Sequence, residues 1–240
     1  MKKIIKYLSI ILISSLCILL SSCTTKDDNS STTTSKTNLT ISHYEDAMTT
    51  DNEGNSNPIV VMNISNGTKI YVELYPDIAP ITVENFLTLV DDGFYTDIVF
   101  HRIIAGFMIQ AGGYAVEDYE GEDDGGPSKV LVQKIGKKTI KGEFSANGVE
   151  NNLLHEKGVL SMARANNPNS ASTQFFICVE DQPSLDGNYA AFGKVINEES
   201  LENAIWISTI PVQGMYIGDI PFEAFPMEPI TITSMERYKG

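Results

Sequence analysis

The sequence predicts a mostly β domain with two helices. Short apolar runs separated by turn residues recur from about Pro58 onward, and two further segments have helical apolar spacing. No internal repeat and no alternating βαβ rhythm occurs. A chain of 240 residues with 42% hydrophobic residues can bury a proper core. We therefore expect one β-rich domain over residues 58–240.

The domain is expected to begin with a hairpin. IVVMNI and KIYVELY flank the turn at Asn66-Gly67, a dipeptide suited to a tight hairpin turn. Further strands are predicted at VFHRII, FMIQAG, GVLSMA, QFFICV and AAFGKVI, and a final one at PITITSM.

Two segments are predicted to be helices that pack by one face. The first follows Pro80, ends near Gly93 and has apolar residues at helical spacing: Val83, Phe86, Leu87 and Val90. The second is EESLENAIWIST, in which Trp206 is expected to pack against the domain.

The first 23 residues have the layout of a signal peptide. Lysines precede an apolar run over residues 7–20 that is too short to span a bilayer comfortably. The run ends in Leu-Ser-Ser-Cys, which resembles the lipobox of bacterial lipoproteins. We expect a signal peptide over residues 1–22 and a lipid on Cys23, so that the protein is exported and anchored to the extracytoplasmic face of the membrane. The alternative is an ordinary signal peptide that contains a cysteine.

Residues 23–57 are predicted to be the lipid-anchored cysteine and a disordered linker. The stretch is rich in Ser, Thr, Asn and Asp and has almost no apolar periodicity. If Cys17 leaves with the signal peptide, Cys178 is the only other cysteine, and its apolar surroundings predict a small buried hydrophobe.

Several function classes are disfavoured by composition and spacing. The formal net charge of −14 argues against a nucleic-acid partner. The glycines match neither a P-loop nor a dinucleotide fingerprint, and His43, His101 and His155 lack metal-site spacing. Gly-x-Ser-x-Gly is absent, so Ser161 has little support as a hydrolase nucleophile. We expect no cofactor and no metal.

Residues 100–113, FHRIIAGFMIQAGG, place His101 and Arg102 in a run made mostly of apolar residues and glycine. A buried, unpaired guanidinium is costly, so this arginine should have a partner or a function. Together with GVLSMARANNPNSASTQFFICV, SLDGNYAAFGKV and the TVENF and IKGEF segments, and in this motif order, the stretch resembles the cyclophilin family of peptidyl-prolyl isomerases.

This resemblance implies a closed eight-stranded antiparallel β-barrel capped by two α-helices, with a substrate groove on its outer wall. It implies an isomerase of X-Pro bonds that acts on proline-containing peptides. With the export signal, the clients would be unfolded exported proteins. We expect a monomer. The alternative function is a non-catalytic cyclophilin-like peptide-binding module or chaperone.

The resemblance also implies site residues. Arg102 matches the catalytic arginine and His101 is the histidine beside it, while Gln110 would hold both Arg102 and a substrate carbonyl. The positions that match the substrate pocket are Phe107, Met108, Ala163, Gln174, Phe176, Leu185 and Tyr189.

Other interpretations and departures remain open. Strand alternation predicts Phe100 on the face of Arg102 and His101 on the opposite face, where its ring could simply bond to backbone. Arg102 could be a structural ion-pair partner. Departures from the family pattern are Ala105 for a turn proline, Arg164 for a frequent asparagine and Ser184 for a bulky ring. The acidic loop at residues 117–124 is expected to be a solvated turn.

Overall fold

The computed structural model describes residues 54, 56–119, 128–136, 138–217 and 219–239. The signal peptide predicted at 1–22, Cys23 and nearly all of the linker predicted at 23–57 lie outside the described residues. Within the described ranges, none of the helices has the length and apolar character to cross a membrane.

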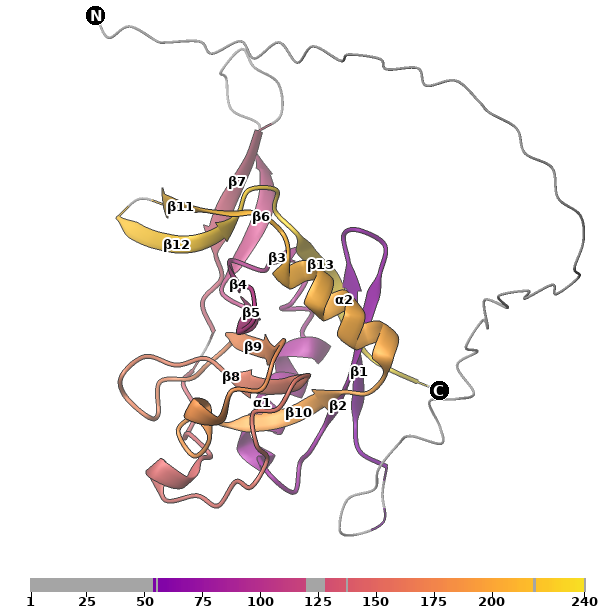
Figure 1. The fold of residues 1–240 in the computed structure, drawn as a ribbon, viewed down its shortest axis with the longest axis vertical. Helices are drawn as coiled ribbons and strands as arrows, with labels where there is room; N and C mark the ends of the chain where they lie inside the picture. The colour runs from indigo at the N-terminus through magenta and orange to yellow at the C-terminus, as the bar shows by residue number, and fades with distance from the viewer. Residues whose placement is uncertain (1–53, 55, 120–127, 137, 218, 240) are drawn as a thin grey trace, which may run out of the picture. The chain divides into compact units, whose positions relative to one another are not determined.

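One antiparallel sheet holds eleven strands in the order β4-β5-β9-β8-β10-β2-β1-β13-β3-β6-β7 (Figure 1). Their bounds are β1 Ile59–Ile64, β2 Lys69–Leu74, β3 Ile98–Val99, β4 Arg102–Ile104, β5 Met108–Ala111, β6 Tyr114–Tyr119, β7 Ser128–Gln133, β8 Val159–Met162, β9 Phe175–Cys178, β10 Ala191–Val195 and β13 Thr231–Arg237. A separate hairpin consists of β11 Val212–Ile217 and β12 Ile220–Pro226.

Eight of these strands correspond to the predicted barrel. β3 and β4 are separated only by Phe100 and His101, so they act as one bent strand. Counted so, they join β1, β2, β5, β8, β9, β10 and β13 in a strongly curled half-barrel. The chain through Phe100 and His101 links the β4 end of the sheet to β3, which pairs with β13. The predicted mostly β class is confirmed.

The break between β3 and β4 changes which side chains share a face. Phe100 and Ile103 both lie in the main core cluster, whereas Ile104 packs with the outer cluster around Met108. The prediction that Phe100 lies on the face of Arg102 was therefore wrong. Strand side chains alternate between two faces only while the strand is continuous. Phe100 and His101 lie outside the strand ladder, so the alternation in β3 does not continue into β4.

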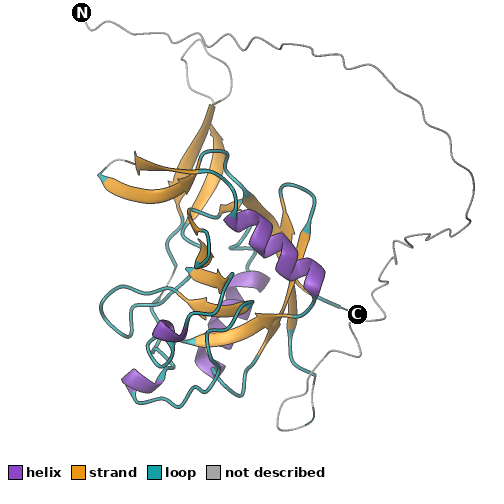
Figure 2. Ribbon diagram, viewed as in Figure 1, coloured by secondary structure: helices purple, strands orange, loops and turns teal. Residues whose placement is uncertain are grey.

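Two helices cover the sheet (Figure 2). In α1, Pro80–Asp91, the predicted positions Val83, Phe86, Leu87 and Val90 are all buried. The Glu143 carboxylate accepts hydrogen bonds from the Ile81 and Thr82 backbone N–H groups at 3.0 and 2.8 Å, which satisfies donors at the helix start. The second helix, α2, spans Glu198–Ser208, and Asn197 caps it by accepting from the Ser200 N–H at 2.7 Å.

Both hairpins outside the eight strands were missed by sequence reasoning. Residues 117–119, expected to belong to a solvated acidic turn, lie in β6 and pair with β7; residues 120–124 lie outside the described residues. Tertiary packing explains the strand, because Tyr114 and Val116 of β6 pack on Phe222 and Phe225 of β12. The two hairpins therefore share a small apolar cluster beside the main core.

Candidate active site

Cross-strand register brings the central candidate residues into one row. Arg102 of β4 lies opposite Gln110 of β5, Gln110 opposite Phe176 of β9, and Phe176 opposite Ser161 of β8. Directly opposed residues of antiparallel strands project from the same face. The row therefore places a cation, an amide and an aromatic ring side by side on the outer wall.

An open cavity of about 180 Å³ lies over this row. We call it the Arg102 pocket. Leu185, from the 3₁₀ turn η4 Pro183–Leu185, and Tyr189 close it on one side. All predicted catalytic and substrate-binding residues except His101 and Gln174 line it: Arg102, Phe107, Met108, Gln110, Ala163, Phe176, Leu185 and Tyr189, with Arg164 in addition.

Arg102 has its guanidinium directed over apolar and sulfur groups. Its Nη1 lies 3.7 Å from the Met108 Sδ, and its Cζ lies 5.9 Å from the centre of the Phe107 ring. Among the ion pairs of the described residues, none involves Arg102. The structural ion-pair interpretation therefore has no support in this part of the chain, and guanidinium N–H donors remain for a ligand.

Gln110 is oriented by another glutamine. Its Nε2 donates to the Gln174 Oε1 at 2.8 Å, so Gln174 acts from behind the pocket wall. Gln110 was predicted to hold Arg102, but in the structure its amide N–H donates to Gln174 instead. Gln110 keeps its own carbonyl oxygen and a second N–H for a peptide.

His101 lies outside the Arg102 pocket. Its ring is 4% exposed and contacts Tyr114 and Phe222, with ring centres 4.9 and 6.1 Å away. Burial lowers the pKa of His101 to about 4, so the imidazole is neutral near pH 7. A neutral ring packed among aromatic groups fits a supporting position better than proton transfer.

A buried polar network supports the pocket from below, and sequence reasoning missed it. His155 Nδ1 lies 3.0 Å from the Asp186 Oδ1, and its Nε2 lies 2.9 Å from the Ser161 Oγ. Because a carboxylate only accepts, Nδ1–H donates to Asp186 and Nε2 accepts from the serine hydroxyl. The His155 ring stacks on Phe176 at 6.1 Å and 17°.

This Ser–His–Asp arrangement does not reintroduce a hydrolase. Ser161 is 0% exposed, so its hydroxyl cannot reach a substrate carbonyl. His155 and Ser161 are six residues apart and Asp186 follows His155 by 31 residues, a spacing that matches no known motif, which is why no pattern revealed them. Their geometry instead fixes Phe176 in the row and Asp186 beside Leu185.

Arg164, a departure from the family pattern, forms part of the pocket rim. Its Nε and Nη2 donate to the Asn188 carbonyl oxygen at 3.1 and 2.9 Å, and its Cζ lies 4.7 Å from the Tyr189 ring centre. Arg164 therefore holds the segment that carries Tyr189 in place.

Cys178 is buried with Met108 and Phe176, as predicted, and burial raises the pKa of its thiol to about 12.

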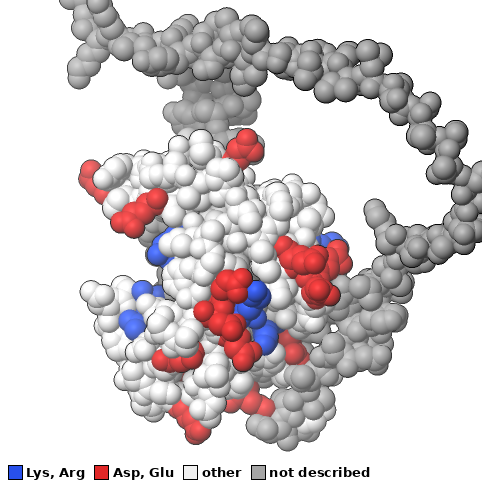
Figure 3. All heavy atoms as spheres, in the orientation of Figure 1, with Lys and Arg blue, Asp and Glu red and all other residues white. Residues whose placement is uncertain are grey.

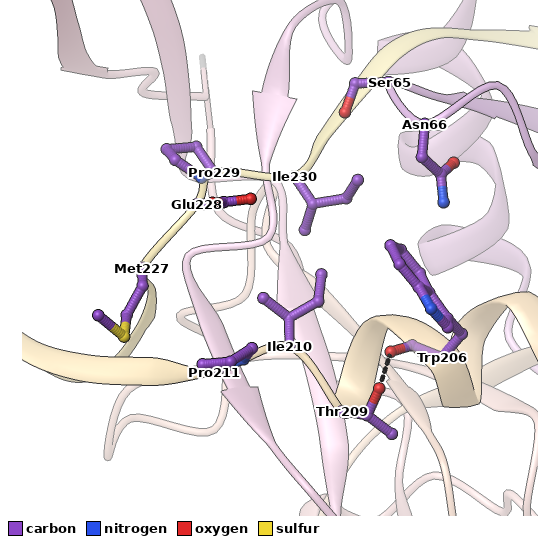
Figure 4. Close-up of a pocket in the computed structure, with 10 residues that line it drawn as sticks. All are labelled: Ser65, Asn66, Trp206, Thr209, Ile210, Pro211, Met227, Glu228, Pro229 and Ile230. Carbon is purple, nitrogen blue, oxygen red and sulfur yellow. Dashed lines mark hydrogen bonds between the residues drawn. The ribbon is translucent and has the colours of Figure 1, made fainter. Parts of the chain in front are cut away.

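A larger cavity of the described residues lies elsewhere. It has a volume of about 670 Å³ and is lined by Trp206, Ile210, Pro211, Met227 and neighbouring residues (Figure 4). Trp206 is 49% exposed, so its expected packing role was wrong. Glu228 is the one charged side chain of the lining, which contains no guanidinium or ammonium group. Volume alone does not make this cavity the candidate site.

The exposed charges fit a peptide partner better than a polyanion. On the face drawn in Figure 3, acidic side chains form several patches and basic ones are fewer. The main group of basic side chains on this face borders acidic ones, so it does not form the isolated basic patch that nucleic-acid binding favours. The described residues contain no group of three His, Cys, Asp or Glu side chains able to hold a metal ion.

Comparisons with known proteins identify the family. Residues 59–237 match the family model for cyclophilin type peptidyl-prolyl cis-trans isomerase/CLD. The Escherichia coli peptidyl-prolyl cis-trans isomerase B is 35% identical over 177 residues, which cover 70% of this chain and 96% of that protein. A peptidyl-prolyl cis-trans isomerase of Acinetobacter baylyi is 34% identical over 186 residues, covering 75% and 86%.

Solved structures agree with this match. The crystal structure of a Cryptosporidium parvum cyclophilin type peptidyl-prolyl cis-trans isomerase has a TM-score of 0.56 and 28% identity, covering 77% of this chain and 99% of that one. A second structure of the same protein, solved in the presence of the dipeptide Ala-Pro, also has a TM-score of 0.56.

Proposed function

Because the chain belongs to the cyclophilin-type peptidyl-prolyl cis-trans isomerase family, we propose that it catalyses X-Pro isomerisation at the Arg102 pocket. One observation carries this assignment: Arg102 has no ion pair among the described residues and borders a cavity of about 180 Å³ whose wall includes the apolar side chains of Met108 and Phe176. This combination offers space for a proline ring and a donor beside it.

The reaction needs a site that prefers the twisted amide. Rotation about the X-Pro bond breaks amide resonance and crosses a barrier of roughly 18–20 kcal/mol. The prolyl nitrogen then gains a localised lone pair. A guanidinium donor bonds the planar amide weakly and the twisted amide strongly, so Arg102 lowers the barrier by differential binding.

The remaining pocket residues hold the peptide. Met108, Phe176 and Leu185 form an apolar surface for the proline ring and reduce hydration around the guanidinium. Gln110, oriented by Gln174, binds a peptide carbonyl or N–H. His101 contributes by packing behind Arg102 and not as an acid or base.

The clients we propose are unfolded exported proteins, reached from a lipid anchor at Cys23. Support comes from the signal-peptide layout of residues 1–22, the lipobox-like end of the apolar run and the polar composition of residues 24–57. The substitution Cys23→Ala should move the protein from the membrane fraction to the soluble one. Unchanged membrane retention contradicts the anchor. The working unit is proposed to be a monomer.

A protease-coupled assay on a proline-containing peptide tests the activity. We expect the purified chain to accelerate the cis-to-trans step, and Arg102→Ala to remove most of that acceleration. The competing function is a peptide-binding module without turnover. It predicts peptide binding by the wild type with no acceleration of the cis-to-trans step.

A further inference from the structure

A second cavity lies on the other side of Arg102. Its volume is about 260 Å³, larger than the 180 Å³ of the Arg102 pocket. Arg102 lines both spaces, and Gln174, which orients Gln110, also faces the second one. The rest of its wall comes from His101, Tyr114 and residues 220–223 of β12. We call this space the β12 cavity.

The β12 cavity has an aromatic base. The rings of Tyr114 and Phe222 meet edge to face with centres 4.9 Å apart, and His101 lies against both. Ile220 adds an aliphatic side chain that is 40% exposed at the rim. The exposed edges of these rings and the Ile220 side chain supply the apolar contacts of the cavity.

The β12 wall is formed before any peptide binds. Phe222 is 8% exposed and also packs on Phe225, with ring centres 5.8 Å apart. Val99 of β3 belongs to the same cluster, which ties the hairpin to the bent strand that carries Arg102. A side chain entering this cavity would therefore meet fixed walls and lose little binding energy to ordering them.

The charges at the rim favour neither sign of side chain. Glu223 and Arg102 both line the cavity and carry opposite charges. A charged side chain would be attracted by one of them and repelled by the other, so the net electrostatic gain is small. A neutral apolar side chain enters without the cost of desolvating a charge.

We propose that the β12 cavity is a substrate subsite that takes a large apolar, preferably aromatic, side chain near the isomerising proline. The inference rests on the proposed function, because it requires the proline to occupy the Arg102 pocket. One extended residue spans roughly 3.3–3.6 Å, so a side chain one or two positions from the proline reaches the far side of one arginine. Peptides with an aromatic residue near proline are thus the preferred substrate class.

The test uses a peptide series around a single Ala-Pro bond. Each of the two positions on either side of the proline is Ala, Phe, Glu or Lys in turn, and kcat/KM is measured for each peptide. At one position, Phe should exceed Ala by roughly threefold to tenfold, as a well-filled apolar pocket provides. Glu and Lys should be no better than Ala there.

Ile220→Ser should reduce the Phe-to-Ala ratio at that position, because it removes apolar surface from the rim. A matched control exists on the partner strand: Val212 is 41% exposed and does not line the β12 cavity. Val212→Ser should leave the ratio unchanged. A ratio near one at every position, or an equal ratio in wild type and Ile220→Ser, overturns the subsite.

A charge variant provides a second measurement if Ile220→Ser does not fold. Glu223→Lys should raise the rate on the Glu-containing peptide relative to the Lys-containing one, by roughly threefold. No change in that relative rate also overturns the subsite. The all-alanine peptide separates the two proposals: wild type that fails to isomerise it contradicts the proposed function, whereas isomerisation without a Phe preference contradicts only the subsite.

Discussion

The Arg102 pocket and the cavity beside Trp206 differ in size and in chemistry. The Trp206 cavity is larger, about 670 Å³ against about 180 Å³. Its lining combines Trp206, Pro211 and Met227 with Glu228 as the charged group. The smaller pocket has a guanidinium at one wall, an amide pair at another and a buried polar network under its aromatic floor.

The difference shows that catalysis depends on what faces a space and not on how large it is. A cavity without a fixed donor beside the amide nitrogen can bind a side chain, but it cannot prefer a twisted amide over a planar one. A guanidinium at the edge of the Arg102 pocket can. The following experiments test this comparison, from the largest expected effect to the smallest.

Arg102→Ala should give the largest loss. We expect kcat/KM to fall by on the order of 10²–10³, about 2.7–4 kcal/mol, as for removal of one preorganised donor. Arg102→Lys should recover part of the rate, since an ammonium lacks the planar fork. Isomerase rate and thermal unfolding are measured on the same samples. A rate that stays high, or falls only through unfolding, contradicts the assignment.

His101 should make the protein less stable in acid. Its pKa is lowered from 6.5 to about 4, so the unfolded chain binds the proton more readily. The contribution of neutral His101 to the unfolding free energy is therefore fully present above pH 6.5 and is lost as pH falls through 4. It amounts to about 3 kcal/mol. His101→Leu should show a smaller loss between pH 7 and pH 4.5 in urea unfolding. An unchanged pH dependence would contradict the buried neutral state. The Trp206 cavity differs in this respect, because none of its lining residues is a histidine.

Asp186→Ala tests the network under the pocket. The variant leaves the His155 Nδ1–H and backbone N–H, bound at 3.0 and 2.7 Å, without their acceptor. We expect a loss of about 1–3 kcal/mol in unfolding free energy, together with a higher KM as the Leu185 side of the pocket shifts. Asp186→Asn keeps an acceptor oxygen and should restore most of both. Equal effects of Ala and Asn would argue against the hydrogen bonds.

Trp206→Ala should have the smallest effect on the reaction. The residue lines the larger cavity, which shares no lining residue with the Arg102 pocket. We expect kcat/KM to stay at the wild-type value and the unfolding free energy to fall by about 1 kcal/mol, because half of the ring is buried. A rate loss comparable to that of Arg102→Ala would mean that the comparison between the cavities is wrong.

Local sequence patterns were enough to predict the eight main strands and both helices. The Asn66-Gly67 turn, the buried face of α1 and the short apolar strands depend on residues close together in the chain. The motif order also identified the pocket residues, of which eight line one cavity. The turn, the strands and the helix face follow from local conformational preference and side-chain periodicity. The pocket residues followed from the resemblance to the cyclophilin family.

Contacts between distant segments were decided only by the tertiary structure. Phe100 lies in the core because the ladder breaks at Phe100 and His101, so the simple alternation of faces does not hold through this segment. His155 contacts Asp186 and Ser161, and β12 lies beside Arg102. No local sequence pattern predicts these contacts, because they depend on how separate elements pack. The sequence by itself determined which chemical groups the pocket contains. Only the packed barrel decided their partners, because burial and hydrogen bonding depend on what the whole fold brings together.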